Sequence, residues 1–331
     1  MKAVYYQEYG SPEVLQYGEQ QKPDLKADQV LVRVYASSVN PIDWKLRKGD
    51  MKVASGMGLA FPKIPGVDIA GQVVETGREV TRFRSGDMVF AKLNGGTGGA
   101  YAQYAVVSSE VLVPMPSNMN YEEAASVPLA ALTALQGLRD KGELQPGEKV
   151  LVNGASGGVG TFAVQIARAL GAGEVVGVCS TKHVDLVKSL GMDRVIDYKQ
   201  EDFTQEKDRY DLIFDAAGKS SYSEAKDSLR EDGRYVTTVP DPVDTAKGYL
   251  TSVFSSKKMK AFFTHDSALD LTQIREWIEA GQIKPVIDRV YDLEQAVEAH
   301  RVSEEGDAAG KIVLRVGGEP DEVVRPRPAA G

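Results

Sequence analysis

A glycine-rich segment, Gly154 to Gly160 (GASGGVG), is the part of this sequence best suited to binding a charged ligand. It follows an apolar stretch, 149–153, that is typical of a strand, and it precedes an apolar-periodic stretch, 161–170, that is typical of a helix. The first turn of such a helix offers unpaired N–H groups and a favourable dipole to a phosphate. We therefore expect a dinucleotide phosphate site here, although Ala155 replaces the first glycine of the G-x-G-x-x-G pattern.

Each residue of the turn has a distinct use in that interpretation. Gly157 and Gly158 let the backbone approach a pyrophosphate, Gly160 permits close packing of helix on strand, and Ser156 can add a hydroxyl donor. The alternative is an ordinary tight turn between two core elements.

The end of the following strand discriminates between NAD and NADP. An NAD site usually places an Asp or Glu there to bind the ribose 2′-hydroxyl, whereas this strand ends in Cys179 followed by Ser180, Thr181 and Lys182. Hydroxyl donors and a cation suit a 2′-phosphate, so the sequence predicts NADPH. In the alternative interpretation Lys182 only begins a solvated helix face, but the missing acid still disfavours NAD.

Two domains are expected from the length of 331 residues and the change of pattern along the chain. Residues 1–125 alternate as short strands and predict a β-rich domain, which 266–316 would complete. Residues 126–265 repeat strand and helix, which predicts a parallel doubly wound sheet. Residues 317–331, rich in Gly, Pro and charge, are expected to form a flexible tail.

Composition excludes several classes of function. A net charge of −8 gives no basic footprint for nucleic acid, and no apolar run is long enough for a membrane span, so a soluble cytoplasmic protein is expected. One cysteine, Cys179, and three histidines rule out a disulfide framework and a cysteine-rich zinc lobe. We expect His183 and His300 to face solvent, and we keep His265 as a distant candidate for the site.

Four motifs together resemble the zinc-independent quinone oxidoreductases of the medium-chain dehydrogenase/reductase superfamily, which include zeta-crystallin and the reticulon-4-interacting proteins. They are 38–43 (SVNPID), 65–71 (PGVDIAG), 154–160 (GASGGVG), and Cys179-Ser180 with 195–198 (VIDY), and the similarity runs from Met1 to about Val316. The resemblance implies an α/β fold: a GroES-like β-rich catalytic domain and a Rossmann domain, with the active site in the cleft between them.

The resemblance also implies site residues and a homodimer. The dimer would form through the edge of the Rossmann sheet, at 234–238 or 260–263. The cofactor contacts implied are Ser156, Gly157, Gly158 and Val159 at the phosphates, Ser180, Lys182 and Tyr198 near the 2′-phosphate and adenine, and Thr133 and Phe263 near the nicotinamide half. Asn40 is a further candidate near the nicotinamide, and Ala217 and Val239 are further candidate cofactor contacts. This chain departs from the family at 215–218 (DAAG for DNVG) and 306–311 (GDAAGK for GHARGK), which removes an amide, a His and an Arg.

No metal is assigned. Zinc-dependent relatives place a Cys after the second strand and a Gly-His-Glu further on, where this chain has 40–43 (NPID) and 66–68 (GVD). Neither Asn40 nor Val67 replaces a soft ligand, and Cys179 is expected to be a small buried hydrophobe on a strand.

Without a Lewis acid, reduction is the expected direction. A quinone or an α,β-unsaturated carbonyl (an enone or alkenal) needs only a nearby hydride and a hydrogen-bond donor on oxygen. The candidates for catalysis are Asn40, Lys45 and Tyr101, while Asp43 would fix its loop through backbone hydrogen bonds and Asn40-Pro41 could instead be a simple turn. The alternative functions are an NADPH-binding structural or regulatory protein with little turnover, and a zinc alcohol dehydrogenase.

Overall fold

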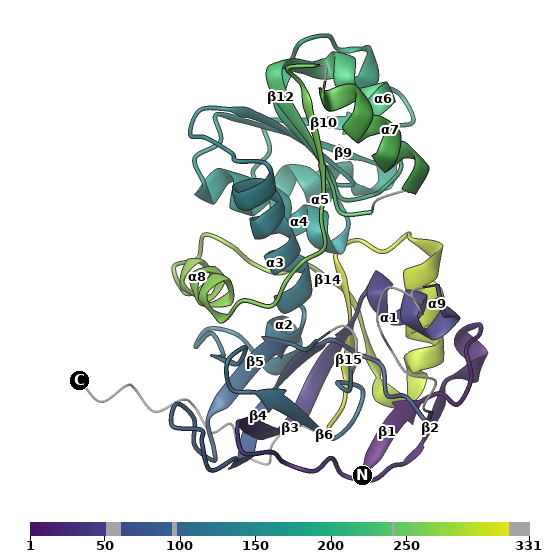
Figure 1. Cartoon of the computed structure of the whole chain (residues 1–331), viewed down its shortest axis with the longest axis vertical. Helices are drawn as coiled ribbons and strands as arrows, with labels where there is room; N and C mark the ends of the chain where they lie inside the picture. The colour runs from purple at the N-terminus through teal and green to yellow at the C-terminus, as the bar shows by residue number, and fades with distance from the viewer. Residues whose placement is uncertain (51–60, 95–97, 240–241, 254, 318–331) are drawn as a thin grey trace. The chain divides into compact units, whose positions relative to one another are not determined.

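The chain folds into two compact units in the computed structural model, which describes residues 1–50, 61–94, 98–239, 242–253 and 255–317 (Figure 1). Unit 1 comprises Met1–Leu129, Asp266–Glu279 and Ile287–Gly331, and unit 2 comprises Ala130–His265 and Ala280–Val286. The division therefore falls four residues later than expected at the first boundary, and the short segment 280–286 adds to unit 2. The expected tail lies outside the described residues apart from Gly317.

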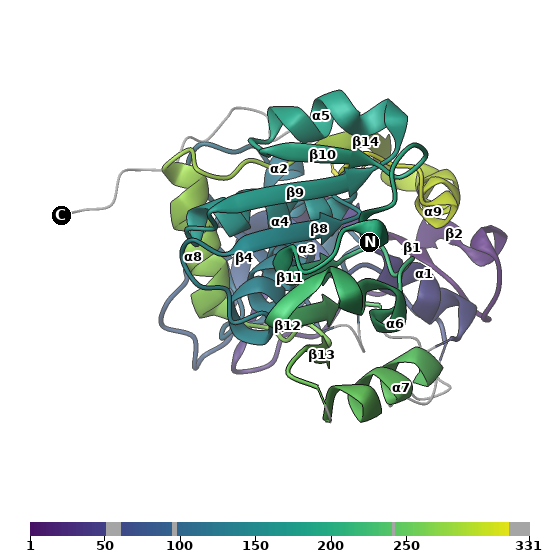
Figure 2. The ribbon, with the colours of Figure 1, turned by 90° about the horizontal axis from the view of Figure 1, so that it is seen from above.

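Unit 2 contains a six-stranded parallel sheet in the part of the chain that is described, with the order β10-β9-β8-β11-β12-β13. Figure 2 shows these strands side by side in that order. The order places the first strand of the unit, β8, in the middle and builds outward in both directions, which is the Rossmann topology. The strands are β8 (Lys149–Asn153), β9 (Glu174–Cys179), β10 (Arg194–Asp197), β11 (Tyr210–Asp215), β12 (Leu229–Thr237) and β13 (Lys258–Ala261).

These strands are apolar because a parallel sheet is covered on both faces. Val150, Leu151, Val152, Val175 and Val176 have no exposed surface. The helices of this unit are α3 (Pro128–Leu135, beginning in unit 1), α4 (Gly158–Ala169), α5 (Val184–Ser189), α6 (Tyr222–Ala225) and α7 (Pro242–Val253). A stretch of π-helix, Gln136–Lys141, continues α3.

Among the described strands, the two edges of this sheet are formed by β10 and β13, and β12 is not at an edge. β12 is paired on both sides, with β11 and with β13. The first of the two expected dimerisation strands, 234–238, is therefore wrong as an edge strand, because its backbone groups are already used within the sheet.

Unit 1 is built on a seven-stranded sheet among its described residues, in the order β14-β15-β3-β4-β5-β7 with β6 also paired to β3. Its pairs are antiparallel except for β14 and β15, which run parallel. The last described strand, β15, pairs with β3, so the segment that contains β15 belongs to this unit. The strands, including a separate pair β1 and β2, are β1 (Lys2–Tyr5), β2 (Gln16–Glu19), β3 (Gln29–Val39), β4 (Asp68–Thr76), β5 (Met88–Lys92), β6 (Tyr104–Ser108), β7 (Val113–Pro114), β14 (Ile287–Asp292) and β15 (Lys311–Arg315).

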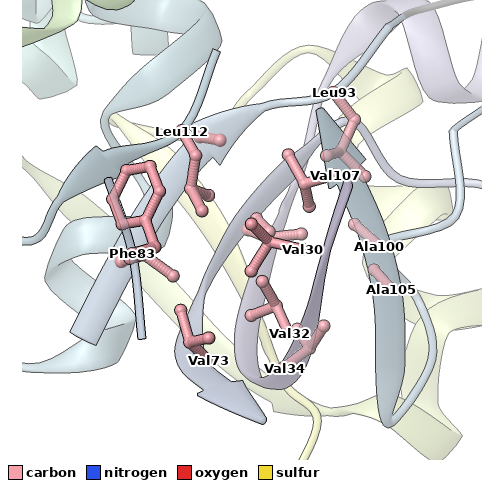
Figure 3. Packing of buried hydrophobic residues seen from close by; sticks show 13 residues of the cluster. Val30, Val32, Val34, Val73, Phe83, Leu93, Ala100, Ala105, Val107 and Leu112 are labelled. Atoms are coloured by element: carbon pink, nitrogen blue, oxygen red, sulfur yellow. The ribbon is translucent and has the colours of Figure 1, made fainter. Parts of the chain in front are cut away.

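Alternating apolar side chains on the long strand β3 form the core of unit 1. Val30, Val32 and Val34 point to one face and meet Val73 of β4 and Val107 of β6, all at most 2% exposed (Figure 3). The period of two that predicted the strand therefore also fixes which side chains enter the core.

A helix, α1 (Pro41–Lys48), follows β3 where a loop or turn was expected. Pro41 occupies its first position, where no backbone N–H is needed, and the Asp43 carboxylate accepts a hydrogen bond from the Asn40 N–H (2.8 Å). Gly49 ends it with φ 86°, in the left-handed region that favours glycine. The other helices of this unit are α2 (Tyr121–Ala125), α8 (Ala268–Glu279) and α9 (Ala296–Glu305). Among the described helices, none has both the length and the hydropathy needed to cross a bilayer.

Replacing Gly160 with alanine should destabilise unit 2. A Cβ there would lie 2.0 Å from the Gly154 carbonyl oxygen and 2.8 Å from the Ala155 Cα, so backbone would have to move. We expect a loss of about 1–3 kcal/mol in the free energy of unfolding, measured by urea denaturation. Gly18→Ala is the matched control, because its Cβ would meet only the Tyr5 side chain, no closer than 3.4 Å; equal stability losses for the two variants would contradict the packing argument.

Candidate functional site

The glycine turn of unit 2 presents an open helix end. α4 begins at Gly158, and no side chain of the described residues caps its N-terminus. The Thr161 N–H is bonded to the Gly157 carbonyl within the helix (2.9 Å), whereas the N–H groups before it belong to the first turn, where a helix has no partners of its own. This end of α4 is therefore suited to an anion.

The glycines of the turn fit a close approach by a phosphate. Gly154 has φ 84°, in the left-handed region. A Cβ on Gly157 would meet, among described atoms, only the Gly154 carbonyl oxygen at 3.5 Å, so its outer face is open. Gly160 by contrast packs tightly on the strand side, which brings the helix end close to the strand.

The segment after β9 places Ser180 and Lys182 beside this turn's strand, because β9 and β8 are neighbours. Ser180 is 8% exposed and Lys182 is exposed. The Thr181 hydroxyl donates to the Asp197 carboxylate (2.6 Å), which also accepts from the Lys199 N–H (3.0 Å). Thr181 is therefore used inside the protein, which leaves Ser180 and Lys182 as the expected contacts for a 2′-phosphate.

Tyr198 and His183 lie in the same part of unit 2. Tyr198 follows β10 directly, and its side chain is 56% exposed, as a platform for an adenine would be. The His183 ring does not simply face solvent, as had been expected: it is half-buried, with Nδ1 3.1 Å from the Ser156 hydroxyl and 3.4 Å from the Ser180 hydroxyl. This residue joins two predicted phosphate contacts and was missed because Ser156 is 27 positions away in the sequence.

Three further expected cofactor contacts occupy the ends of β11, β12 and β13. The Ala217 N–H donates to the buried Asp215 carboxylate (3.3 Å), and the Val239 N–H to the Thr237 hydroxyl (3.2 Å). Val239 is 38% exposed and Phe263 is 70% exposed. Gly218 and Val239 also line a pocket of about 390 Å³ that continues toward α6 and α7.

Thr133 belongs to the same unit but is mostly buried. Its hydroxyl lies 2.6 Å from that of Thr264, and the neighbouring Gln136 side chain bonds both backbone groups of His265 (3.0 and 3.1 Å). These bonds fix the segment that leads away from β13. His265 itself is exposed.

A buried polar cluster in unit 1 contains Asn40, Asp68 and Lys311. The Asn40 side chain accepts from the Lys311 ammonium and donates to the Asp68 carboxylate (2.8 Å). The ammonium lies 3.6 Å from the same carboxylate and also donates to the Val39 carbonyl oxygen (3.3 Å). Both ends of the Asn40 amide are thus engaged within the protein, and Asn40 is only 2% exposed. This geometry favours a positioning role for Asn40 over direct catalysis.

A second buried polar group in this unit consists of Asp43, Tyr101 and His300. The Tyr101 hydroxyl lies 3.5 Å from the Asp43 carboxylate and 3.3 Å from His300 Nε2, and all three residues are at most 1% exposed. The burial argues against the expected role of Tyr101 as a donor to substrate. The expectation that His300 faces solvent is wrong, because α9 packs this side of the helix against the core.

Burial shifts the pKa values of Asp43 and His300 in this group. Asp43 accepts backbone hydrogen bonds from Asn40 and Gly66, as expected, but desolvation raises the pKa of its carboxyl to about 7, with the nearby Asp68 charge adding to the effect. Desolvation lowers the pKa of His300 to about 3, and repulsion from Arg47 acts in the same direction.

In unit 2, desolvation raises the pKa of Cys179, which is buried as expected, to about 11.

Lys45 alone of the three expected catalytic residues has appreciable exposed surface. It lies on α1, with its ammonium 5.6 Å from the Trp44 ring centroid. Within the described ranges, no group of three or more His, Cys, Asp or Glu side chains is arranged to hold a metal ion.

Two family profiles match the chain. The family described as "Alcohol dehydrogenase GroES-like domain" matches residues 26–117, and the family described as "Zinc-binding dehydrogenase" matches residues 190–314. The first match covers most of β3 to β7 of unit 1. The second runs from the end of α5 in unit 2 to β15 in unit 1.

Individual relatives match over nearly the whole chain. The "Quinone-oxidoreductase homolog, chloroplastic" of Spinacia oleracea is 34% identical, covering 95% of this chain and 98% of the relative. The "NADPH-dependent alkenal/one oxidoreductase, chloroplastic" of Arabidopsis thaliana is 33% identical, covering 95% and 79%. Among solved structures, a quinone oxidoreductase from Coxiella burnetii superposes with a TM-score of 0.88 at 29% identity, covering 96% of this chain and 99% of that one.

Removing the buried ammonium should destabilise unit 1. In Lys311→Met the Asp68 carboxylate keeps its burial but loses its counter-charge, for which we expect a loss of about 3–5 kcal/mol in the free energy of unfolding. Adding Asp68→Asn to this variant should recover part of the loss, since the uncompensated charge is then gone. Chemical denaturation of the single and double variants measures both effects; full additivity of the two losses would contradict the pairing.

The pH dependence of stability should reveal Asp43. Because its folded pKa, about 7, exceeds the ordinary value of 3.8, the unfolded chain binds fewer protons at this group between about pH 4 and 7. The stability that Asp43 contributes is therefore present at the acid end and is lost as the pH rises through about 7. Asp43→Asn should remove this decline from the profile of unfolding free energy against pH.

His300 provides the opposite sign for comparison. Its folded pKa is lowered to about 3 from 6.5, so its contribution grows with pH between those values. His300→Gln should remove a rise of the unfolding free energy with increasing pH, whereas Asp43→Asn should remove a fall. Parallel profiles for wild type and Asp43→Asn would show that the carboxyl titrates normally.

Proposed function

Because the chain belongs to the medium-chain dehydrogenase/reductase superfamily, together with the quinone oxidoreductase homologues that it matches almost end to end, we propose that it is a zinc-independent, NADPH-dependent oxidoreductase. Its substrate class is quinones or α,β-unsaturated carbonyls. The observation that carries the proposal is the uncapped N-terminus of α4 behind a glycine turn whose outer face is open.

The pyrophosphate would bind at this helix end. The backbone of Gly157, Gly158 and Val159 supplies N–H groups, and the Ser156 hydroxyl adds a donor from the same turn. The partial positive charge of the helix end then adds to these bonds. All of these groups come from one β-α connection, so the proposed pyrophosphate site depends on unit 2 alone.

The selectivity for NADPH would come from the end of β9. A carboxylate at that position would repel a 2′-phosphate, and Ser180 and Lys182 stand there instead. The nearby Asp197 is not such a carboxylate, since it is the last residue of the next strand, β10, and accepts hydrogen bonds from Thr181 and Gln200. The exposed Tyr198 would cover the adenine.

NADPH, when bound, supplies the hydride that the reduction needs. Within unit 1, Lys311 and Asp68 fix Asn40, and Asp43 fixes the start of α1, so these side chains would hold the segment that carries Lys45 in shape. Lys45 is the candidate donor to the substrate oxygen, because it is the one of the three expected catalytic residues that is not buried. The positions that carry thiolate and imidazole in zinc-dependent relatives hold residues of 40–43 and 66–68 with no soft ligand, which supports zinc independence.

Two further properties, the oligomeric state and the location in the cell, are predictions. A homodimer would use β13, one of the two edge strands of the described sheet, as its contact. A cytoplasmic location also stays a prediction, since the two relatives named above are chloroplastic.

The test is the oxidation of NADPH and of NADH by the purified full-length chain with a panel of quinones and enones, with and without a metal chelator. We expect faster oxidation of NADPH than of NADH, and no effect of the chelator. The substrate that gives the largest kcat/KM names the class.

Three other results would each contradict one part of the proposal. Loss of activity with chelator, restored by zinc, would overturn zinc independence. A preference for NADH would overturn the assignment of Ser180 and Lys182. Binding of NADPH without turnover on any substrate would favour the structural or regulatory alternative.

A further inference from the structure

His183 stands between the two parts of the expected phosphate site. It ends the short 3-10 turn Thr181–His183 after β9, and its Nδ1 contacts Ser156 from the glycine turn after β8 and Ser180 from the end of β9. One ring nitrogen therefore bridges the turn expected at the pyrophosphate and the residue expected at the 2′-phosphate.

The chemistry of this bridge restricts the directions of the two hydroxyls. If Nδ1 carries no proton, it can only accept, and a serine that donates to it has used its only hydrogen. If Nδ1 carries the proton, it donates to a serine oxygen, and that serine's hydrogen remains available for a phosphate oxygen. The form protonated at Nδ1 is thus the one compatible with phosphate binding at these serines.

We propose that His183 is a positioning residue for the 2′-phosphate of NADPH, acting through Ser180 and, at the pyrophosphate, through Ser156. This inference rests on the proposed function, because it requires that the turn binds a nicotinamide dinucleotide. The single hydrogen on Nδ1 would be shared by the Ser156 and Ser180 oxygens in a three-centre hydrogen bond, and the hydrogens of both serines would then be available to the ligand.

The position of the ring makes the effect unequal for the two cofactors. Ser156 faces a pyrophosphate that NADH and NADPH share, whereas Ser180 lies at the end of β9, where only NADPH carries a phosphate. Loss of the ring should therefore weaken NADPH binding more than NADH binding. A ring that only braced the fold would affect both alike.

Three variants test this. His183→Ala removes the bridge, and His183→Asn keeps a donor, because the Asn Nδ2 occupies the place of the His Nδ1 relative to Cβ. Lys188→Ala is the matched control: it removes an exposed side chain of α5, on the following helix, that contacts neither serine. The Kd values for NADPH and NADH are measured by titration calorimetry, together with the thermal unfolding midpoint of each variant.

We expect His183→Ala to raise the Kd for NADPH by roughly tenfold and that for NADH by no more than about threefold. His183→Asn should recover much of the NADPH affinity, and Lys188→Ala should leave both values unchanged. Ser180→Ala should add little in the His183→Ala background, because the two residues act through one contact.

Equal weakening of both cofactors, unchanged NADPH affinity, or full additivity of His183→Ala with Ser180→Ala would overturn the inference. If the wild-type chain binds neither NADPH nor NADH, the proposed function itself fails. If it binds NADPH well and His183→Ala does too, only the role of His183 fails.

Discussion

The buried charge of Asp68 is the constraint around which unit 1 is organised. A carboxylate without exposed surface must be neutralised and hydrogen-bonded, and no single neighbouring segment supplies all the partners. Ser38 comes from β3, Asn40 from the start of α1, the Leu129 N–H from α3 and the ammonium from Lys311 on β15. Satisfying one carboxylate therefore joins four segments, and it holds the last described strand to the segment that precedes α1.

The cluster of Asn40, Asp68 and Lys311 also shows why the role of Asn40 could not be predicted from the sequence. Asn40 was chosen for its place in a motif, but its amide is engaged by Asp68 and Lys311, and Lys311 was considered only as the end of the GDAAGK stretch. The partners Asn40 and Lys311 are 271 positions apart, so their contact depends on the pairing of β15 with β3. Local sequence patterns do not contain that information.

Unit 2 could be predicted in much more detail, and the reason is physical. Strands buried on both faces are continuous apolar runs, and the helices between them show a period near 3.6, so β8, α4 and β9 were recognised to within three residues. The pairing order of the strands and the contact of His183 with Ser156 were not accessible in the same way, since both depend on which strands become neighbours. In unit 1, the helix α1 was not predicted, because Asn40-Pro41 also suits a turn. Pro41 at the first position and Asp43 at the third are nevertheless ordinary signs of a helix start.

The open end of α4 also has a thermodynamic meaning for the free chain. Side chains cap α2 and α6, from Asn120 and Ser221, whereas α4 starts without such a cap, as α5 and α9 also do. A cap is worth about 1 kcal/mol to a helix, and at α4 a bound anion would supply it. A ligand that binds only the folded state adds RT ln(1 + [L]/Kd) to its stability, about 2.7 kcal/mol at a hundred times Kd. An anion that binds this helix end in the folded chain alone would therefore raise the free energy of unfolding as its concentration rises.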